Sequence, residues 1–408
     1  MNAGDTAWVL VSTALVMLMT PGLAFFYGGM VRRKNVLSVL MQCMIVLCLV
    51  SVLWVIYGYS LAFAPGKSFW GGFQWWMLNG VSLEPYNDYS ATIPHQAFMI
   101  FQAMFAVITP ALIIGGFAER MKFSSFLVFI TLWLTFVYAP VCHWVWGMGG
   151  FLRDLGALDF AGGTVVHINA GIAALVMAIM LGRRKNTDKH VPAPHNVPFI
   201  VLGTALLWFG WFGFNAGSAL AANGLATNAF VVTNTAAAAA GLSWAIIEWV
   251  RGGKPTMFGV CSGAVAGLVA ITPAAGFVNV GGAVIIGLLV SVFCYFAAVV
   301  IKPQLGYDDA LDAFGVHCVG GIWGALATGL FATKFVNSAG NDGLFFGNPA
   351  QFLIQIKAVA VTLIYSGIVT AVIFKVVDLV MGMKVSPKDE DVGLDLTQHH
   401  ERAYTMLE

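Results

Sequence analysis

The chain has 408 residues, of which 59% are hydrophobic and only 10% are charged, and its formal net charge is +1. A soluble domain carries roughly 25% charged residues, so the composition indicates an integral membrane protein, and the near-zero net charge argues against a nucleic-acid partner. The six cysteines form no CxxC pair and show no metal-ligand spacing, so we expect neither a disulfide framework nor a metal site.

Long apolar stretches follow one another along the chain, and each has the length of a membrane-crossing helix, about 17–25 residues. The first is preceded by Asp5 and by no Lys or Arg, and "RRK" follows it, which is typical of a retained helix rather than a cleaved signal peptide. We predict eleven spans, at residues 8–31, 36–63, 96–118, 123–145, 162–182, 198–219, 226–250, 257–273, 279–301, 312–333 and 352–381.

The basic residues predict how these spans are oriented. If the amino terminus lies outside, only Lys67, Arg153, Lys334 and Lys357 fall on the outer side, so 16 of the 20 Lys and Arg residues lie in the cytoplasm. Cytoplasmic loops carry this excess in membrane proteins. We therefore expect an N-out, C-in protein of the cell membrane, with one transmembrane domain over residues 1–383 and a cytoplasmic tail over residues 384–408.

Two of the predicted spans each carry a histidine. "DFAGGTVVHINAG" (residues 159–171) contains His167 in the fifth span, and "DAFGVHCVGGIWGAL" (residues 312–326) contains His317 in the tenth. Five crossings separate them, and "FFYGGMV" in the first span resembles "FGFNAGSAL" in the sixth at the same offset. This pattern is typical of an inverted repeat, here helices 1–5 and 6–10, with helix 11 as an unpaired addition.

A single histidine in a membrane helix is most often a neutral imidazole that bonds to a carbonyl of the next helix. Two at equivalent places in an inverted repeat would instead meet at the centre, and ionisable groups at depth usually face a pathway or one another. Burial and like charge disfavour protonation of both, so we predict a neutral pair that shares one hydrogen bond and leaves its outer nitrogens free. Haem ligation is the competing interpretation, but no other feature requires a porphyrin cavity.

Aromatic side chains gather near the outer ends of three spans. Trp146 lies in "HWVWGMGG", Phe105 in "FQAMFAVITP", and Trp211, Phe214 and Ser218 near the end of the sixth span. An interfacial aromatic belt is the ordinary explanation. A cation–π cage with Ser218 as an acceptor is the functional one, and Phe105 with Phe214 could close a dry constriction beneath it.

Carboxylates precede both histidine spans. Asp159 heads the fifth span, where we expect it to cap free N–H groups rather than to contact a ligand. Capping and charge balance also account for Asp308, Asp309 and Asp312 before the tenth span. The chain has no nucleotide-binding, serine-hydrolase or metalloprotease motif and no run of paired buried carboxylates, so we expect neither an enzyme nor an energised pump.

Six stretches follow one another in the chain: "PGLAFFYGG", "GALDFAGGTVVHINAG", "WFGFNAGSA", "CSGAVAGLVAITPAAG", "DAFGVHCVGGIWG" and the tail "VGLDLTQHHERAY". Through these stretches the chain resembles the ammonium transporter family (Amt/Mep/Rh), in particular its prokaryotic Amt branch. The resemblance implies an all-α polytopic fold of eleven helices and a homotrimer with one pore per subunit. In the tail, His400 replaces the glycine that many members have, so the turn at this point is open to question.

The resemblance assigns roles along one path through the bundle. They are an outer ammonium site (Trp146, Ser218, Phe105), a gate (Phe105, Phe214), a pore lining (His167, His317, Trp211) and a supporting carboxylate (Asp159).

The implied function is an ammonium transporter or channel without a cofactor or metal, with methylammonium as a substrate analogue. It would recruit NH4+, deprotonate it and conduct NH3, with or without separate proton transfer. The alternative is an ammonium sensor that signals through its tail. A PII-type regulatory protein is a possible cytoplasmic partner, and lipid surrounds the subunit.

Overall fold

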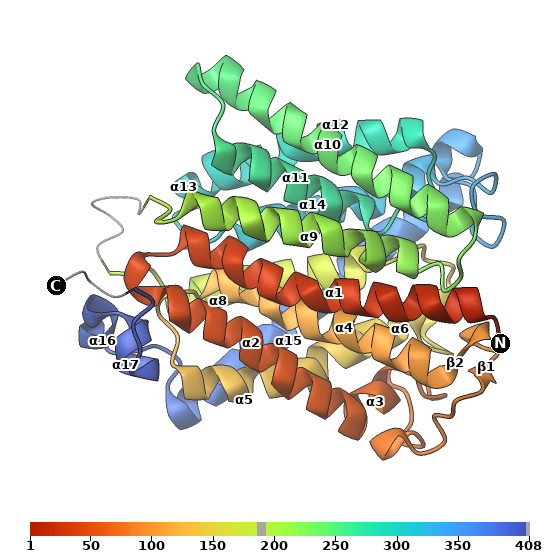
Figure 1. The fold of residues 1–408 in the computed structure, drawn as a ribbon, viewed down its shortest axis with the longest axis horizontal. Helices are drawn as coiled ribbons and strands as arrows, with labels where there is room; N and C mark the ends of the chain where they lie inside the picture. Colours follow the sequence, from red (N-terminus) through yellow and green to blue (C-terminus); the bar gives the residue numbers. More distant parts are fainter. Residues whose placement is uncertain (186–192, 405–408) are drawn as a thin grey trace.

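Long helices packed side by side make up the protein (Figure 1). The structure, a computed structural model, describes residues 1–185 and 193–404. Lys189, one of the cytoplasmic residues in the charge argument, and residues 405–408 of the predicted tail lie outside the described residues.

The first half of the chain forms one series of helices with a small hairpin on the outer side. Its elements are α1 (Ala3–Met30), η1 (Arg33–Asn35), α2 (Val36–Leu53), η2 (Trp54–Gly58), α3 (Tyr59–Phe63), η3 (Trp76–Leu78), the antiparallel strands β1 (Pro85–Tyr86) and β2 (Ser90–Pro94), α4 (His95–Ile113), η4 (Ile114–Gly116), α5 (Phe123–Trp133), η5 (Leu134–Tyr138), α6 (Ala139–Trp146), α7 (Phe151–Asp154), η6 (Gly163–Ile168) and α8 (Asn169–Leu181).

The second half forms a matching series, followed by a long helix and the tail. Its elements are α9 (Val197–Gly217), α10 (Gly224–Gly252), α11 (Met257–Ile271), α12 (Val280–Tyr295), η7 (Phe296–Ile301), α13 (Lys302–Leu305), η8 (Phe314–Cys318), α14 (Val319–Phe331), η9 (Leu344–Phe346), α15 (Pro349–Met381), α16 (Pro387–Val392) and α17 (Leu394–His399).

Each of the eleven predicted spans corresponds to a helix or to a helix with a π-helical segment. Ten of them are long and apolar enough to cross a membrane, whereas the predicted span 257–273 is a 15-residue helix, α11. At about 1.5 Å per residue it is shorter than a hydrocarbon core of roughly 30 Å. Nearly all of α11 and the turns after it are buried in the bundle, where irregular backbone is tolerated because protein, not lipid, surrounds it.

The first helix of each half packs directly on the other, and Figure 1 shows α1 beside α9. Glycine makes the close approach possible. A Cβ at Gly203 of α9 would lie 2.3 Å from the backbone nitrogen of Phe26, and a Cβ at Gly29 of α1 would lie 2.6 Å from the carbonyl oxygen of Asn196. Small residues at helix contacts allow the backbones to pack closely, and this packing stabilises the contact in lipid, where the hydrophobic effect does not drive helices together.

Interrupted helices mark the repeat. π-helical segments occur in the fourth and ninth spans (η5, η7) and in the fifth and tenth (η6, η8), which is the five-helix offset read from the sequence. A further one, η2 in the second span, has no counterpart in α10 of the seventh. The fifth and tenth spans run antiparallel, because Arg183 at the end of α8 donates a 2.8 Å hydrogen bond from Nε to the carbonyl of Gly306, just before η8. The second half therefore repeats the first in the opposite direction.

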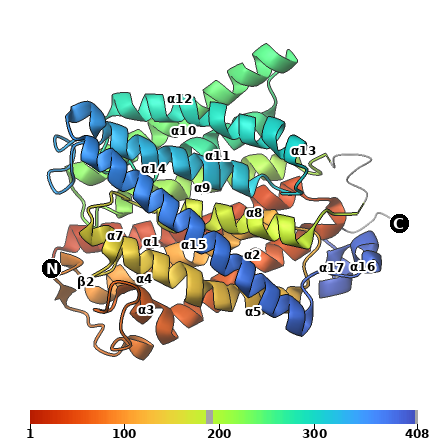
Figure 2. The same ribbon diagram turned by 180° about the vertical axis from the view of Figure 1, so that it is seen from behind.

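The tail helices α16 and α17 lie at the opposite end of the bundle from the start of α1 (Figure 1). Figure 2 shows α15 running across the outside of the bundle and reaching the same end as α16 and α17. The loops that carry Arg32, Arg120 and Arg184 also lie at this end, because their side chains belong to a charged cluster, described below, that lies beside the tail. This arrangement agrees with the predicted orientation.

Candidate functional site

Both histidines lie in π-helical segments at the start of broken spans, His167 in η6 and His317 in η8. A carboxylate eight positions before each histidine caps the segment. Asp159 accepts three backbone N–H bonds of 2.6–2.8 Å around the start of η6, and Asp309 accepts two, of 2.8 and 3.2 Å, around the start of η8. The caps satisfy backbone groups inside the protein that would otherwise lack partners.

The two histidines meet at the centre of the repeat. Their ring centroids are 5.4 Å apart and the ring planes differ by 14°. Each helix has a glycine four residues after its histidine, at the contact with the other helix. A Cβ at Gly171 would lie 2.3 Å from the backbone nitrogen of Cys318, and one at Gly321 would lie 3.1 Å from Cβ of His167. These glycines let the two backbones approach, so the rings face each other.

The predicted hydrogen bond between the imidazoles is absent. Both ring nitrogens of His167 and Nδ1 of His317 are buried without a partner among the described residues, and the side chains are 1% and 3% exposed. The backbones hold the rings at a separation at which no pair of nitrogens meets hydrogen-bond geometry. Buried polar atoms without partners are rare in proteins and require an explanation.

A narrow cavity of about 10 Å³ lies against the histidine pair, among apolar side chains from several helices. That volume is about one water-sized probe, far too small for a porphyrin, which argues against haem ligation. The ring of Trp211 lies 5.4 Å from that of His167 at 17°, and its Nε1 donates a 2.8 Å hydrogen bond to Oγ1 of Thr272. Apart from the imidazoles and the indole of Trp211, the side chains that line this cavity are apolar.

Two phenylalanines lie in contact with each other between the histidine pair and Trp146. The rings of Phe105 and Phe214 are 4.3 Å apart, and Phe214 lies 6.1 Å from the ring of His167. Both side chains are at most 1% exposed. Above them the edge-to-face contact of Phe105 with Trp146, at 5.8 Å and 88°, connects this phenylalanine pair to the outer cavity.

The outer cavity has a volume of about 250 Å³, and its lining includes Trp146, Ser218, Asp159 and Gln102. The indole Nε1 of Trp146 donates a 2.9 Å hydrogen bond to the carbonyl of Asp159, and the hydroxyl of Ser218 donates one of 2.8 Å to the carbonyl of Phe214. The serine hydrogen is therefore engaged and its oxygen is left as an acceptor. Phe105, predicted as part of the outer site, lies below this cavity rather than in its lining.

The carboxylate of Asp159 supports the cavity without offering it a free oxygen. Besides the backbone donors described above, the hydroxyl of Thr164 bonds to Oδ2. All these donors belong to the start of the fifth span, so the capping role expected from the sequence accounts for the side chain, and the contact of the Asp159 carbonyl with Trp146 positions the indole.

Sequence reasoning overlooked most of the residues that line this cavity, among them Gln102 and Arg153. Gln102 lies three positions before Phe105, on the same helical face, so a polar residue in an apolar run was the available signal. Arg153 was treated only as an outer basic residue, yet its Nη1 donates a 2.8 Å hydrogen bond to the carbonyl of Trp146. Loop residues of this kind have no periodicity that would place them.

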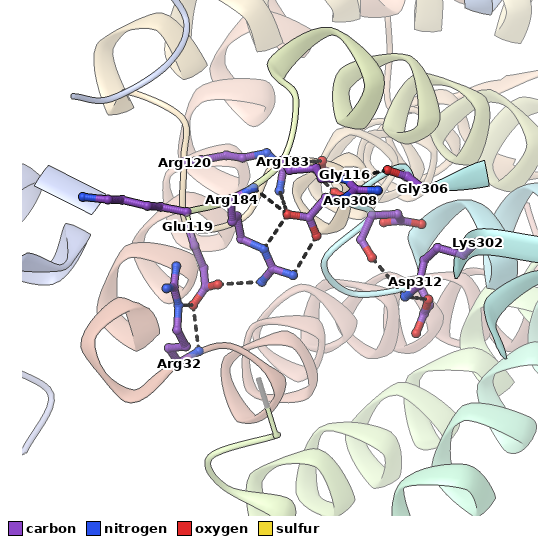
Figure 3. Close-up of polar contacts among 12 residues, drawn as sticks. Arg32, Gly116, Glu119, Arg120, Arg183, Arg184, Lys302, Gly306, Asp308 and Asp312 are labelled. Carbon is purple, nitrogen blue, oxygen red and sulfur yellow. Dashed lines mark hydrogen bonds and ion pairs between the residues drawn. The ribbon is translucent and has the colours of Figure 1, made fainter. Parts of the chain in front are cut away.

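A cluster of paired charges lies at the tail end of the bundle (Figure 3). Glu119 accepts hydrogen bonds from Nε of Arg32 at 3.0 Å, from Nδ2 of Asn35 at 2.7 Å and from Nη1 of Arg184 at 2.6 Å. Arg184 also donates from Nε and Nη2 to the two carboxylate oxygens of Asp308, at 2.9 and 2.8 Å. One arginine thus joins the buried carboxylate of Glu119 to the partly buried carboxylate of Asp308, which comes from a different loop.

A second arginine and a lysine extend the cluster toward the tenth span. Arg120 is fully buried and donates from Nη2 to the carbonyls of Gly116 and Asp308, at 2.7 and 2.6 Å. Lys302 pairs with Asp312, just before η8. Capping and charge balance, expected from the sequence, therefore account for these acidic residues, although the sequence did not reveal their partners.

The pairing changes the titration of both central carboxylates. Burial alone would raise the pKa of Glu119, but the charges of Arg184 and Arg32 lower it below the usual value. Burial acts the same way on Asp308, and the hydrogen bond and charge of Arg184, with the charge of Arg120, lower its pKa to about 2. Both carboxylates are therefore ionised at neutral pH, and neighbouring arginines stabilise the ionised form of each.

The tail docks beside this cluster. Nζ of Lys34 donates a 2.8 Å hydrogen bond to the carbonyl of Glu390, and the backbone N–H of Ser38 donates one of 2.8 Å to Asp395. His400, in place of the family's glycine, ends α17 in the left-handed conformation, with φ 56° and ψ 29°. The turn that the resemblance left in question is therefore present, with a histidine in a conformation that favours glycine.

The chain is similar to known proteins over nearly its whole length. The model of the Ammonium Transporter Family matches residues 7–404. An ammonium transporter of Bacillus subtilis is 55% identical over 99% of both chains, and the ammonium transporter Amt1 of Archaeoglobus fulgidus is 51% identical over 99% of this chain and all of its own.

Solved structures share the fold. The crystal structure of Candida albicans Mep2 superimposes with a TM-score of 0.90 at 37% identity, covering 95% of this chain and 88% of that one. A structure described as a sensor Amt protein has a TM-score of 0.89 at 31% identity and covers 97% and 98%. With its membrane-spanning helices and these relatives, the chain belongs to the ammonium transporter family of multi-pass cell-membrane proteins.

Proposed function

We propose that the protein recruits NH4+ in the outer cavity, removes its proton above the phenylalanine pair and conducts NH3 past the two histidines. The observation that carries the proposal is the narrow cavity of about 10 Å³ at His167 and His317, whose imidazole nitrogens are buried and largely unpaired. A path of this size and polarity suits a small neutral molecule that can both donate and accept hydrogen bonds.

Desolvation decides which form crosses. Taking an ion out of water costs several kcal/mol even after the protein relaxes, and the apolar path offers no counter-charge beside the histidines. A neutral amine costs far less to bury, and that cost falls further when it bonds to a partner. The free nitrogens of His167 and His317 supply that partner at the depth where hydrocarbon would supply none.

The outer cavity suits the charged form instead. A cation over the face of Trp146 gains about 0.5–2 kcal/mol from the ring, and the oxygen of Ser218 is available as an acceptor because its hydrogen is bonded to Phe214. Because the outer cavity favours the cation and the apolar region at the histidines excludes charge, the ammonium ion should lose its proton between these two places. The charge moved per ammonium taken up, measured on a supported membrane, tells whether the proton stays outside or crosses separately.

Methylammonium uptake into proteoliposomes tests the proposal. The His167→Leu/His317→Leu double variant should lose most of the uptake, roughly tenfold or more, because the neutral amine would then cross without a hydrogen-bonding partner. Unchanged rate and selectivity in the double variant would show that the histidines have no part in conduction.

A sensing role is the second candidate, because a relative described as a sensor Amt protein has the same fold and the tail here docks beside the loops that end several spans. Binding of ammonium by purified protein without flux into proteoliposomes would favour sensing over transport. The homotrimer and the PII-type partner follow from the family resemblance and stay predictions, testable by mass measurement in detergent and by pull-down with a purified PII protein.

A further inference from the structure

The outer cavity contains a polar group that the transport proposal does not use, the side-chain amide of Gln102. Gln102 lies on α4, four positions after Phe98 and three before Phe105, and this spacing puts the three side chains on one helix face. Phe98 and Gln102 line the cavity, whereas Phe105 belongs to the phenylalanine pair below it. The amide therefore lies on the face of α4 that leads from the cavity to the phenylalanine pair.

The amide is buried and its oxygen has no partner. Gln102 is 8% exposed, and its Oε1 makes no hydrogen bond. Of the residues that line this cavity, all in the described part of the chain, Gln102 is the only one with a buried side-chain oxygen or nitrogen that lacks a partner. An unpaired acceptor at the wall of a cavity is explained if its partner is a molecule that enters the cavity.

The other acceptors that line the cavity differ from Gln102, because the carboxylate of Asp88 is exposed to solvent and the side-chain oxygens of Asp159 and Ser218 are partly occupied. Both carboxylate oxygens of Asp159 are taken by donors from the start of the fifth span. Ser218 can offer only its oxygen, because its hydrogen bonds to the carbonyl of Phe214. An ammonium ion has four N–H groups, and the face of Trp146 with the oxygen of Ser218 leaves some of them without an acceptor.

We propose that Oε1 of Gln102 accepts an N–H of the ammonium ion in the outer cavity and so sets the affinity of this site. The inference rests on the proposed function, which it extends by one substrate-binding residue. Because the amide is neutral, it adds an acceptor for the cation without adding a charge that would retain the released proton. A bond to an ionised donor is also stronger than one between neutral groups.

The experiment is the concentration dependence of methylammonium uptake into proteoliposomes. Gln102→Leu, which keeps the size but removes the acceptor, should raise KM roughly tenfold or more with the maximal rate within about twofold. Gln102→Glu, which keeps an acceptor oxygen, should hold KM at or below the wild-type value. The matched control is Gln96→Leu on the same helix, because Gln96 is exposed and its amide bonds to the carbonyl of Val81; its KM should not change.

The readout separates the two proposals. A misfolded fraction lowers the maximal rate but leaves KM unchanged, so poor folding of a variant cannot imitate the expected result. An unchanged KM in Gln102→Leu, while wild type takes up methylammonium, would overturn the role of Gln102 and leave the transport proposal standing. An absence of uptake by folded wild type would instead contradict transport itself.

Discussion

Two buried polar regions of this protein differ in how their groups are paired. At the pore, His167 and His317 have ring nitrogens without partners. At the tail end, Glu119 is buried and the side chain of Asp308 is 10% exposed, yet each accepts several hydrogen bonds from arginine side chains. The first region carries imidazole nitrogens without partners and the second carries paired charges.

The difference predicts how substitutions in each region act. Removing one partner from a buried ion pair leaves a charge without compensation and is strongly destabilising. Removing a neutral group that has no partner breaks nothing and can even stabilise the fold. Substitutions in the cluster should therefore act on stability, whereas substitutions of the histidines should act on transport.

The largest effect is expected at the centre of the cluster. Arg184→Met removes the guanidinium that joins Glu119 to Asp308, and we expect the free energy of unfolding in detergent to fall by about 3–5 kcal/mol. The matched control is Lys185→Met, whose pair with Asp391 is about half exposed, so this substitution should lower the free energy of unfolding far less. Equal effects of the two substitutions would remove the distinction between the buried cluster and the surface.

Acid should weaken the cluster through the same carboxylates. Asp308 has a pKa of about 2 in the folded protein against about 3.9 when unfolded. Its contribution, about 2 kcal/mol, is fully present above pH 4 and is lost as the pH falls toward 2. Burial and the charge of Asp312 raise the pKa of Asp309 to about 6. Asp309 is therefore already protonated in the folded protein between pH 4 and 2, and its effect on stability as the pH falls is opposite in sign to that of Asp308. Stability curves between pH 4 and 2 should be flatter for Asp308→Asn; curves of equal slope would contradict the assignment.

A smaller gain is expected in the tail beside the cluster. His400 has φ 56°, a conformation that costs an L-residue roughly 1–2 kcal/mol, and His400→Gly should relieve most of it at some entropic cost. The amides of α17 should then exchange hydrogen more slowly, because the free energy of opening of this helix should rise by about 1 kcal/mol. His399→Gly should have the opposite effect, because that ring packs 4.9 Å from the ring of Phe123. Faster exchange in His400→Gly would show that the histidine side chain holds the tail.

The smallest change in stability is expected at the pore. The His167→Leu/His317→Leu variant should unfold within about 1 kcal/mol of wild type, because no described hydrogen bond of His167 is lost and the surroundings are apolar. Denaturation in detergent gives the value beside the transport rate. A large loss of stability would mean that the imidazoles hold the bundle together.

The sequence predicted the bundle and the meeting of the two histidines well, because both leave regular signals. Hydrophobic length gave the spans, the basic loops gave the orientation, and the matching surroundings of His167 and His317 predicted that they would meet. The predicted hydrogen bond between the rings was wrong, since the spacing of residues does not fix the distance and angle between two side chains.

The cytoplasmic cluster was not predictable in the same way. Arg32, Glu119, Arg184 and Asp308 come from loops far apart in the sequence, and no periodicity connects them. Their pairing depends on how the ends of the helices are brought together in the bundle. Gln102 was overlooked for another reason, because a single amide in an apolar helix does not reveal whether its oxygen has a partner until the neighbours are known.

The central claim, that the substrate gives up a proton before it passes the histidines, is tested most directly by potassium. K+ resembles ammonium in charge and size but has no proton to release. In the same proteoliposomes, the account predicts rapid uptake of ammonium and no flux of K+ above protein-free vesicles, even with K+ in large excess. Passage of K+ at a rate comparable to ammonium would contradict it.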